Sequence, residues 1–272
     1  MAKHAFRVAI EKGAGKEEFG HVFAADVALY APMLTKPVRG VEQVRNIVGL
    51  AARITGPIKY TLEINDPRQS ILLWNGKVDG FTLQGATILV DGEDGRVREM
   101  RVLMRSWPME TLFRNAMHQE LSVRVPADFW EVGSKPIFTG QRVFTPIALK
   151  PIALAPDVEL HSPILARSVK GKAAVEAALK MAHAVQSPSS YTSVIATPKL
   201  LVELFDCNAD GYPMEGLWVS KLNEQGQIND LTVYLRPYPA VTVLRNKAKE
   251  LAAHTKEFAF LTVEYWELPK SA

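Results

Sequence analysis

Apolar and polar positions along the chain predict two successive sets of secondary structure elements in the same order. In the first set, apolar residues recur at helical spacing from residue 6 to about residue 23, with an interruption by a Gly-Ala-Gly sequence. Residues 27–29 alternate as in a short strand, and a second helix with one buried face follows. Four strands then lead to a last helix that begins at Pro108. We expect the second helix at 41–51 and the four strands at 59–65, 69–75, 80–90 and 96–106.

The second set repeats the first at a spacing of 131 positions. Residues 26–32 read Asp-Val-Ala-Leu-Tyr-Ala-Pro, and residues 157–163 read Asp-Val-Glu-Leu-His-Ser-Pro. A duplication makes each copy one folding unit, so we expect two domains, residues 1–133 and 134–272. The second copy departs at its start, because residues 137–154 contain two prolines and resist a continuous helix. The same spacing superposes Gly40 on Gly171, Tyr60 on Tyr191, Asp79 on Asp210, Gly85 on Gly216, Gly95 on Gly226 and Arg105 on Arg236.

Composition narrows the class of protein without naming a ligand. Of the 272 residues, 47% are apolar and 22% are charged, as in a globular protein with a sizeable core. The net charge of +3 and the absence of long lysine or arginine runs argue against binding to nucleic acid. No apolar stretch approaches the roughly 18 residues that span a bilayer, and the charged N-terminal sequence is untypical of a signal peptide. One cysteine, Cys207, and six scattered histidines indicate no disulfide, no metal and no cofactor, so we expect a cytoplasmic protein.

The order of elements and several short motifs resemble the nuclear-transport-factor-2-like fold, in particular its SnoaL-like branch. The motifs are Asp26-Val27 with Pro32 and Gly40, Val78-Asp79-Gly80-Phe81 with Gly85, Asp94-Gly95 and Arg105, each with a counterpart in the second copy. The resemblance implies an α+β fold of two tandem cones, each a curved antiparallel sheet wrapped on helices. It also implies a pocket between sheet and helices that often holds a small apolar molecule, and dimers formed through the sheets. We therefore expect the copies to pack as an intramolecular pseudo-dimer, and leave further oligomerisation open.

The last strand of each copy has one mixed face and one aliphatic face, because side chains alternate along a strand. The mixed face of the second copy carries Asp230 and Arg236, and that of the first carries Glu99 and Arg105. We expect the aliphatic faces to be buried where the two copies pack together. These faces consist of Met100, Val102 and Met104 in the first copy and of Leu231, Val233 and Leu235 in the second.

Arg105 and Arg236 occupy, by alignment from the glycine turn, the position where the related polyketide cyclases carry their acid/base aspartate. An arginine stays charged and cannot shuttle a proton near neutral pH, which argues against a cyclase mechanism in either copy. Each arginine could bind a carboxylate or enolate of a ligand. The alternative is structural, in which each arginine pairs with Glu99 or Asp230 or caps the chain that follows.

Two aromatic positions of the repeat are further candidates. His161 is the counterpart of Tyr30, so the two copies cannot share a general base there, and a ring that fills space explains both residues. Tyr60 and Tyr191 are retained in both copies. Their hydroxyls could donate to an oxyanion, or bond to backbone as strand tyrosines commonly do.

The sequence leaves three functions open. The first is a binding protein or pseudoenzyme for a small, mostly apolar molecule. The second is an isomerase, cyclase or lyase active in the second copy only, with His161 as base, Tyr191 as donor and Asp230 or Arg236 in support. The third is a structural or interaction role. Pockets filled by Trp and Met side chains would favour this role, whereas a cavity on the order of several hundred Å³ lined by His161 and Tyr191 would favour binding or catalysis. The candidates for ligand binding are Tyr30, Tyr60, Arg105, Trp107, His161, Tyr191, Trp218 and Arg236.

Overall fold

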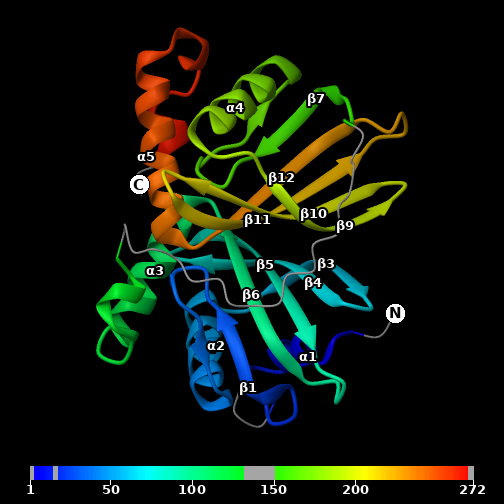
Figure 1. Cartoon of the computed structure of the whole chain (residues 1–272), viewed down its shortest axis with the longest axis vertical. Helices are drawn as coiled ribbons and strands as arrows, with labels where there is room; N and C mark the ends of the chain where they lie inside the picture. Colours follow the sequence, from blue (N-terminus) through cyan, green and yellow to red (C-terminus); the bar gives the residue numbers. More distant parts are fainter. Residues whose placement is uncertain (1–2, 15–17, 132–150, 269–272) are drawn as a thin grey trace.

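The computed structural model of the chain describes residues 3–14, 18–131 and 151–268, and shows two α+β halves stacked along the long axis (Figure 1). We call the described residues up to 131 repeat 1 and those from 151 onward repeat 2. The boundary expected between residues 133 and 134 lies outside the described residues, as does most of the irregular start expected at 137–154.

The described parts of both repeats share a common series of elements in the same order, as the repeated sequence predicts. In this series, a long and a short strand precede a helix, four long strands follow, and a long helix comes after the last strand. Repeat 1 contains α1 (Ala5–Glu11), β1 (Phe23–Tyr30), β2 (Val38–Arg39), α2 (Val41–Thr55), β3 (Lys59–Asp66), β4 (Gln69–Val78), β5 (Phe81–Asp91), β6 (Val97–Arg105), α3 (Trp107–Leu121) and a 3₁₀ helix, η1 (Ala127–Phe129). Repeat 2 contains β7 (Leu154–His161), β8 (Val169–Lys170), α4 (Lys172–Val185), β9 (Ser190–Thr197), β10 (Leu200–Ala209), β11 (Tyr212–Leu222), β12 (Ile228–Arg236), α5 (Tyr238–His254), η2 (Lys256–Phe258) and α6 (Val263–Trp266).

The first helix is shorter than the sequence predicts. Helix α1 ends at Glu11, and Gly13 and Ala14 follow with φ of 117° and 55°. A positive φ interrupts helical hydrogen bonding, so the apolar residues beyond it no longer continue the helix. Phe23, expected near the end of the helix, instead begins β1.

The strands form one continuous sheet that curls around the helices of each repeat. Its path runs β3-β4-β5-β6-β12-β11-β10-β9, and β6 meets β12 through a single residue pair, Met104 and Leu235. Strand β1 pairs parallel to β6, and β7 pairs parallel to β12 in the same way. Each half is therefore a cone, as expected.

No helix in the described part of the chain is long and apolar enough to cross a membrane.

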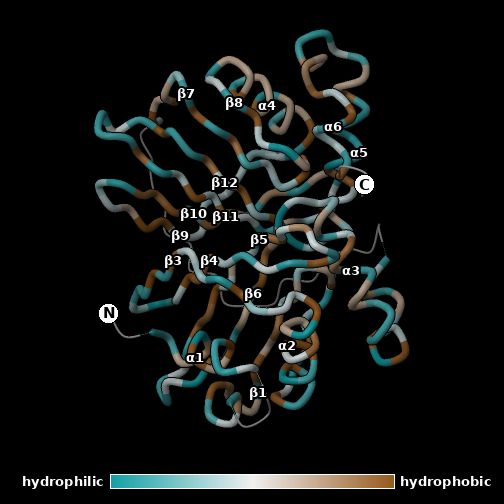
Figure 2. Tube along the Cα trace, turned by 180° about the vertical axis from the view of Figure 1, so that it is seen from behind, coloured by the Kyte–Doolittle hydropathy of each residue, from teal (hydrophilic) through white to brown (hydrophobic). Residues whose placement is uncertain are grey.

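Three apolar clusters form the core. One fills the cone of repeat 1 and one fills the cone of repeat 2. The third lies between the repeats, where β4, β5 and β6 face β10, β11 and β12. In Figure 2, hydrophobic positions, drawn in brown, occur along these strands, whereas the hairpin tips are teal, which marks hydrophilic residues.

The faces that meet between the repeats are not those predicted. The aliphatic faces of the last strands pack inside the cones, with Met100 and Met104 in the core of repeat 1 and Leu231 and Leu235 in that of repeat 2. The mixed faces, which carry the arginines, point toward the other repeat. The expectation that the aliphatic faces would meet there is wrong, because each is needed to cover its own helices.

Candidate functional site

Small cavities lie inside the cones, between each curled sheet and its helices. The cavity of repeat 1 measures about 60 Å³ and that of repeat 2 about 40 Å³. Pockets for drug-sized ligands typically enclose roughly 300–1,000 Å³. Both cones are therefore largely filled by their own side chains, among them Trp74, Met100 and Met104 in repeat 1 and Phe205 and Trp218 in repeat 2.

The cavity of repeat 1 is apolar except for a few polar groups, of which one hydroxyl stands out. Tyr60 of β3 lines the cavity, and its hydroxyl is buried with no hydrogen-bond partner among the described residues. Burial raises the pKa of this hydroxyl, so it stays a neutral donor. Nearby, the Trp74 indole N–H donates to the Thr87 hydroxyl at 3.0 Å, so those two groups satisfy each other.

The cavity of repeat 2 is lined by Trp218 of β11, whose indole nitrogen is buried and finds no partner in the part of the chain that the structure describes. Tyr191, predicted to share this pocket, is not among the residues that line it. It is 36% exposed, and its ring centroid is 6.4 Å from that of Phe205. Glu203 lies two residues before Phe205 on β10 and so shares this face, and burial raises the pKa of its carboxyl group.

Neither cavity is lined by a group suited to acid/base chemistry near neutral pH. The described lining residues of both include no Asp, Glu, His, Cys, Lys or Arg. The titratable side chain among them is that of Tyr60, whose pKa burial raises.

The structure does not bring the predicted trio His161, Tyr191 and Asp230 together. His161 Nε2 lies 3.5 Å from Asp230 Oδ2, and Lys221 Nζ is 3.2 Å from the same oxygen. Burial alone would raise the pKa of Asp230, but hydrogen bonds and charge from His161 and Lys221 lower it. Both residues lie on the sheet face opposite the cone, because Leu160 points into the core next to His161. Tyr191 lies on the cone side, so the catalytic hypothesis lacks the geometry that it requires.

Arg105 and Arg236 lie buried between the repeats and bind the opposite repeat in equivalent ways. Arg105 Nε donates to the Ser162 carbonyl at 3.2 Å. Arg236 Nη2 donates to the Ala31 carbonyl at 3.5 Å and to the Leu34 carbonyl at 3.4 Å. Ser162 and Ala31 occupy the same position of the repeat. A pseudo-two-fold axis therefore relates these contacts, and the arginines join the repeats.

The side chains that face these arginines differ in charge. Gln84 accepts a hydrogen bond from Arg105, whereas Glu215 forms an ion pair with Arg236, and both pairs span neighbouring strands in the same register. Burial lowers the pKa of Arg105 to about 10. Burial also lowers the pKa of Arg236, against the opposing effect of the Glu215 carboxylate. Tyr30 is buried with its ring centroid 5.4 Å from the Arg236 guanidinium carbon, so it belongs to this packing as well.

Trp107 and Tyr238, which are equivalent residues, stack on each other across the interface with ring centroids 5.6 Å apart. The Trp107 indole N–H donates to the Thr242 hydroxyl at 2.8 Å, and the Tyr238 hydroxyl lies 3.0 Å from that of Thr111. The axis thus passes between two aromatic rings. Trp107, predicted to bind a ligand, takes part in this contact between the repeats.

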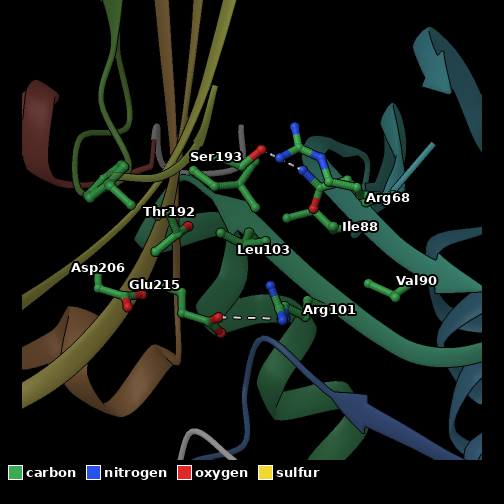
Figure 3. Close-up of a pocket in the computed structure, with 13 residues that line it drawn as sticks. Arg68, Ile88, Val90, Arg101, Leu103, Thr192, Ser193, Asp206 and Glu215 are labelled. Atoms are coloured by element: carbon green, nitrogen blue, oxygen red, sulfur yellow. Dashed lines mark hydrogen bonds and ion pairs between the residues drawn. The ribbon is translucent and has the colours of Figure 1, made fainter. Parts of the chain in front are cut away.

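A third cavity, of about 100 Å³, lies between the strands of repeat 1 and those of repeat 2 (Figure 3). Arg101 Nε is 3.7 Å from Glu215 Oε1 across this cavity, and Gln69 Nε2 donates to the Ser193 hydroxyl at 2.9 Å. Figure 3 shows Arg101 of repeat 1 and Glu215 and Ser193 of repeat 2 around Leu103. The cavity is lined by Arg68, Gln69, Ile88, Val90, Arg101 and Leu103 of repeat 1 and by Thr192, Ser193, Leu204, Phe205, Asp206, Glu215 and Gly216 of repeat 2.

The charged residues of this cavity were missed by reasoning from the sequence. That reasoning favoured residues retained in both copies, most of which are scaffold. The useful signal is a departure between the copies, because acidic Asp206 and Glu215 stand where repeat 1 has Asn75 and Gln84. Among the predicted ligand-binding residues, Tyr60 and Trp218 do line a cone cavity.

Comparison with known proteins shows likeness of fold. No family profile and no curated protein sequence matches the chain. An uncharacterised bacterial protein with a cystatin-like fold from Silicibacter pomeroyi is similar at 18% identity, over 44% of this chain and 88% of its own, with a TM-score of 0.42. A steroid delta-isomerase from Pseudomonas aeruginosa is similar at 18% identity, over 45% of this chain and 95% of its own, with a TM-score of 0.41. An NTF2-like protein of unknown function from Cytophaga hutchinsonii is similar at 14% identity, over 37% of this chain and 84% of its own, with a TM-score of 0.30.

Proposed function

We propose that this protein binds a small, mostly apolar molecule in the cone of repeat 1 and performs no cyclase-type acid/base catalysis. The observation that carries the proposal is Tyr60, which lines an otherwise largely apolar cavity and whose buried hydroxyl has no partner among the described residues. Buried polar groups normally have a hydrogen-bond partner. A ligand with an apolar body and one polar end would supply it.

The size of the cavity limits the ligand. At about 60 Å³ it is smaller than an engineered cavity of roughly 150 Å³ that binds benzene. Met33, Met100 and Met104 line it, and unbranched methionine side chains adapt readily to a guest. The ligand we propose is therefore a single-ring molecule that enters as these methionines change rotamer.

A structural role is the second candidate, and the small volumes of both cones favour it. In that case the cones are simply cores, and the unpartnered Tyr60 hydroxyl carries no function. An isomerase, cyclase or lyase in repeat 2 has less support, because His161 and Tyr191 lie on opposite faces of the sheet.

Calorimetric titration of the protein with p-cresol and with toluene tests the proposal. We expect both probes to bind, and Tyr60→Phe to weaken p-cresol about two- to tenfold while leaving toluene unchanged, because only the hydrogen bond is lost. Tyr191→Phe is the matched control and should change neither affinity. Ala51→Leu should abolish both by filling the cavity. Absence of binding, or binding that Ala51→Leu leaves intact, would favour the structural role.

A further inference from the structure

A further cavity lies in repeat 1, outside the cone, between helix α2 and the C-terminal end of helix α3. Its volume is about 300 Å³, several times that of either cone and at the lower end of the roughly 300–1,000 Å³ that ligand pockets enclose. Phe19, Leu50 and Leu121 supply its apolar lining, and all three are buried. This cavity therefore has room for a small molecule without movement of the core.

The polar lining of the cavity carries a net positive charge. Arg45 and Arg53 come from α2, and Arg124 lies just after the end of α3. Glu120 is the one acidic residue among the described lining residues, so the net charge is +2. In the described part of the chain, none of these four side chains forms an ion pair. The three guanidinium groups therefore repel one another, and an anion in the cavity would relieve that repulsion.

Arg45 is held in place by neutral groups. Its Nη2 donates to the Phe19 carbonyl and to the Gly20 carbonyl, at 3.0 Å each. These carbonyls orient the guanidinium without compensating its charge. Arg45 Nε is buried and has no hydrogen-bond partner among the described residues, although buried donors normally have one. Arg45 is thus positioned in advance and still has an N–H group to offer.

The two arginines of α2 are brought toward each other across a glycine. Arg45, Gly49 and Arg53 are spaced four residues apart, so they lie on one face of the helix. Arg53 Nη1 lies 3.9 Å from the point that a Cβ on Gly49 would occupy, so this side chain extends back along α2 toward Arg45. Gly49 itself lines the cavity, and its missing side chain leaves space between the two arginines.

A phosphate monoester matches this lining better than a single carboxylate. It carries a charge of about −1.5 to −2 near neutral pH, which compensates a net charge of +2, whereas a single carboxylate compensates half of it. Its several oxygens can accept from more than one guanidinium group, and the planar arginine fork suits phosphate geometry. The apolar lining residues would contact the carbon frame of such a molecule.

We propose that the cavity between α2 and α3 is a binding site for a small organic phosphate. The phosphate group lies among Arg45, Arg53 and Arg124, and the carbon frame contacts Leu50 and Leu121. The site shares no lining residue with the cone cavity of repeat 1, so it does not depend on the function proposed for that cone.

The chain itself provides the substitutions that test the arginines. Repeat 2 lacks the cluster, because the residues equivalent to Arg45, Arg53 and Arg124 are Glu176, Ala184 and Thr255. Arg53→Ala and Arg124→Thr therefore copy residues that repeat 2 carries at the same places. Both arginines are exposed and lack a partner among the described residues, so we expect both variants to fold.

Calorimetric titration of the full chain with phenyl phosphate tests the proposal. Benzoate has the same ring with one charge, and inorganic phosphate has the charge without a carbon frame. We expect one phenyl phosphate to bind per chain, about tenfold or more tightly than benzoate. It should also bind more tightly than inorganic phosphate, because the ring adds apolar contact.

Arg53→Ala and Arg124→Thr should each weaken phenyl phosphate about tenfold or more, through loss of a charge-assisted contact. Arg167→Ala is the matched control, because it removes an exposed arginine of repeat 2 that does not line this cavity, and it should change nothing. Ala51→Leu fills the cone of repeat 1 and should leave phenyl phosphate binding intact. Failure of this site and failure of the cone site are therefore distinguishable.

Three results would overturn the proposal. The first is absence of phenyl phosphate binding at millimolar concentration. The second is binding of benzoate or inorganic phosphate as tight as that of phenyl phosphate. The third is an affinity that both Arg53→Ala and Arg124→Thr leave unchanged, with circular dichroism showing that the two variants are folded.

Discussion

Removal of Arg236 should destabilise the protein more than removal of its equivalent, Arg105. Both guanidinium groups are buried between the repeats, at 0% and 7% exposure. Their partners differ, because Arg236 forms an ion pair with Glu215, whereas Arg105 donates to the neutral Gln84 side chain and the Ser162 carbonyl. Arg236→Met leaves a carboxylate in a buried site, and Arg105→Met leaves only neutral acceptors.

The sizes of the two effects follow from these partners. Removing one member of a buried ion pair costs about 3–5 kcal/mol, since the other charge stays uncompensated. Arg101 Nε, 3.7 Å from Glu215, keeps the cost near the lower end of that range. Arg105→Met loses neutral hydrogen bonds, for which we expect about 1–2 kcal/mol. The free energies of unfolding of the two variants should therefore differ by at least about 1 kcal/mol.

Urea denaturation of the two variants and the wild type measures this difference, provided that the dependence on urea concentration stays the same. The double variant Glu215→Gln with Arg236→Met removes the stranded charge and should recover about 1–2 kcal/mol of the loss. Equal losses for Arg236→Met and Arg105→Met, or a double variant no more stable than Arg236→Met, would show that the buried charge is not the cause.

Three further predictions concern single side chains. Gly216→Ala should lower the free energy of unfolding by about 1–3 kcal/mol in urea denaturation, because its Cβ would lie 2.0 Å from the Phe205 ring; an unchanged value would refute the clash. Glu110→Gln should stabilise the protein increasingly as pH rises. Burial raises the pKa of Glu110 well above 4.5, so the folded wild type keeps a proton that the unfolded chain releases and loses stability above that pH; denaturation from about pH 4 to 8 should show this widening gap. His161→Ala should cost less than about 1 kcal/mol by thermal unfolding, because its contact with Asp230 is partly exposed, and a larger loss would point to a role that we have not assigned.

The positions of the strands along the chain could be predicted because the sequence signals for strands and turns are local. The expected strand at 59–65 is β3 at Lys59–Asp66, and the one at 96–106 is β6 at Val97–Arg105. Glycine turns fix the ends of these strands wherever a positive φ is needed, as at Gly95. The duplication then supports each assignment twice.

The site could not be predicted because alternation identifies two faces but not their neighbours. Met104 and Arg105 point to opposite sides of β6, and no local pattern shows which side meets the other repeat. The outcome depends on atoms far away in the sequence, such as the Ser162 carbonyl that receives Arg105. His161 resembled a pocket residue for the same reason, although it lies on the face opposite the cone.

Leu103 and Tyr234 occupy equivalent positions of the two repeats, and a difference of this kind has a consequence for how such a chain can evolve. In a homodimer of identical subunits, a mutation at a symmetric interface is made twice, so a new hollow and the residue that blocks it cannot be separated. Fusion of the two halves removes that constraint, because each half mutates independently. One half can then carry a large aromatic side chain that packs in the interface, while the other half carries a smaller side chain at the equivalent position. Covalent linkage here permits asymmetry at an interface whose main contacts remain paired about the axis.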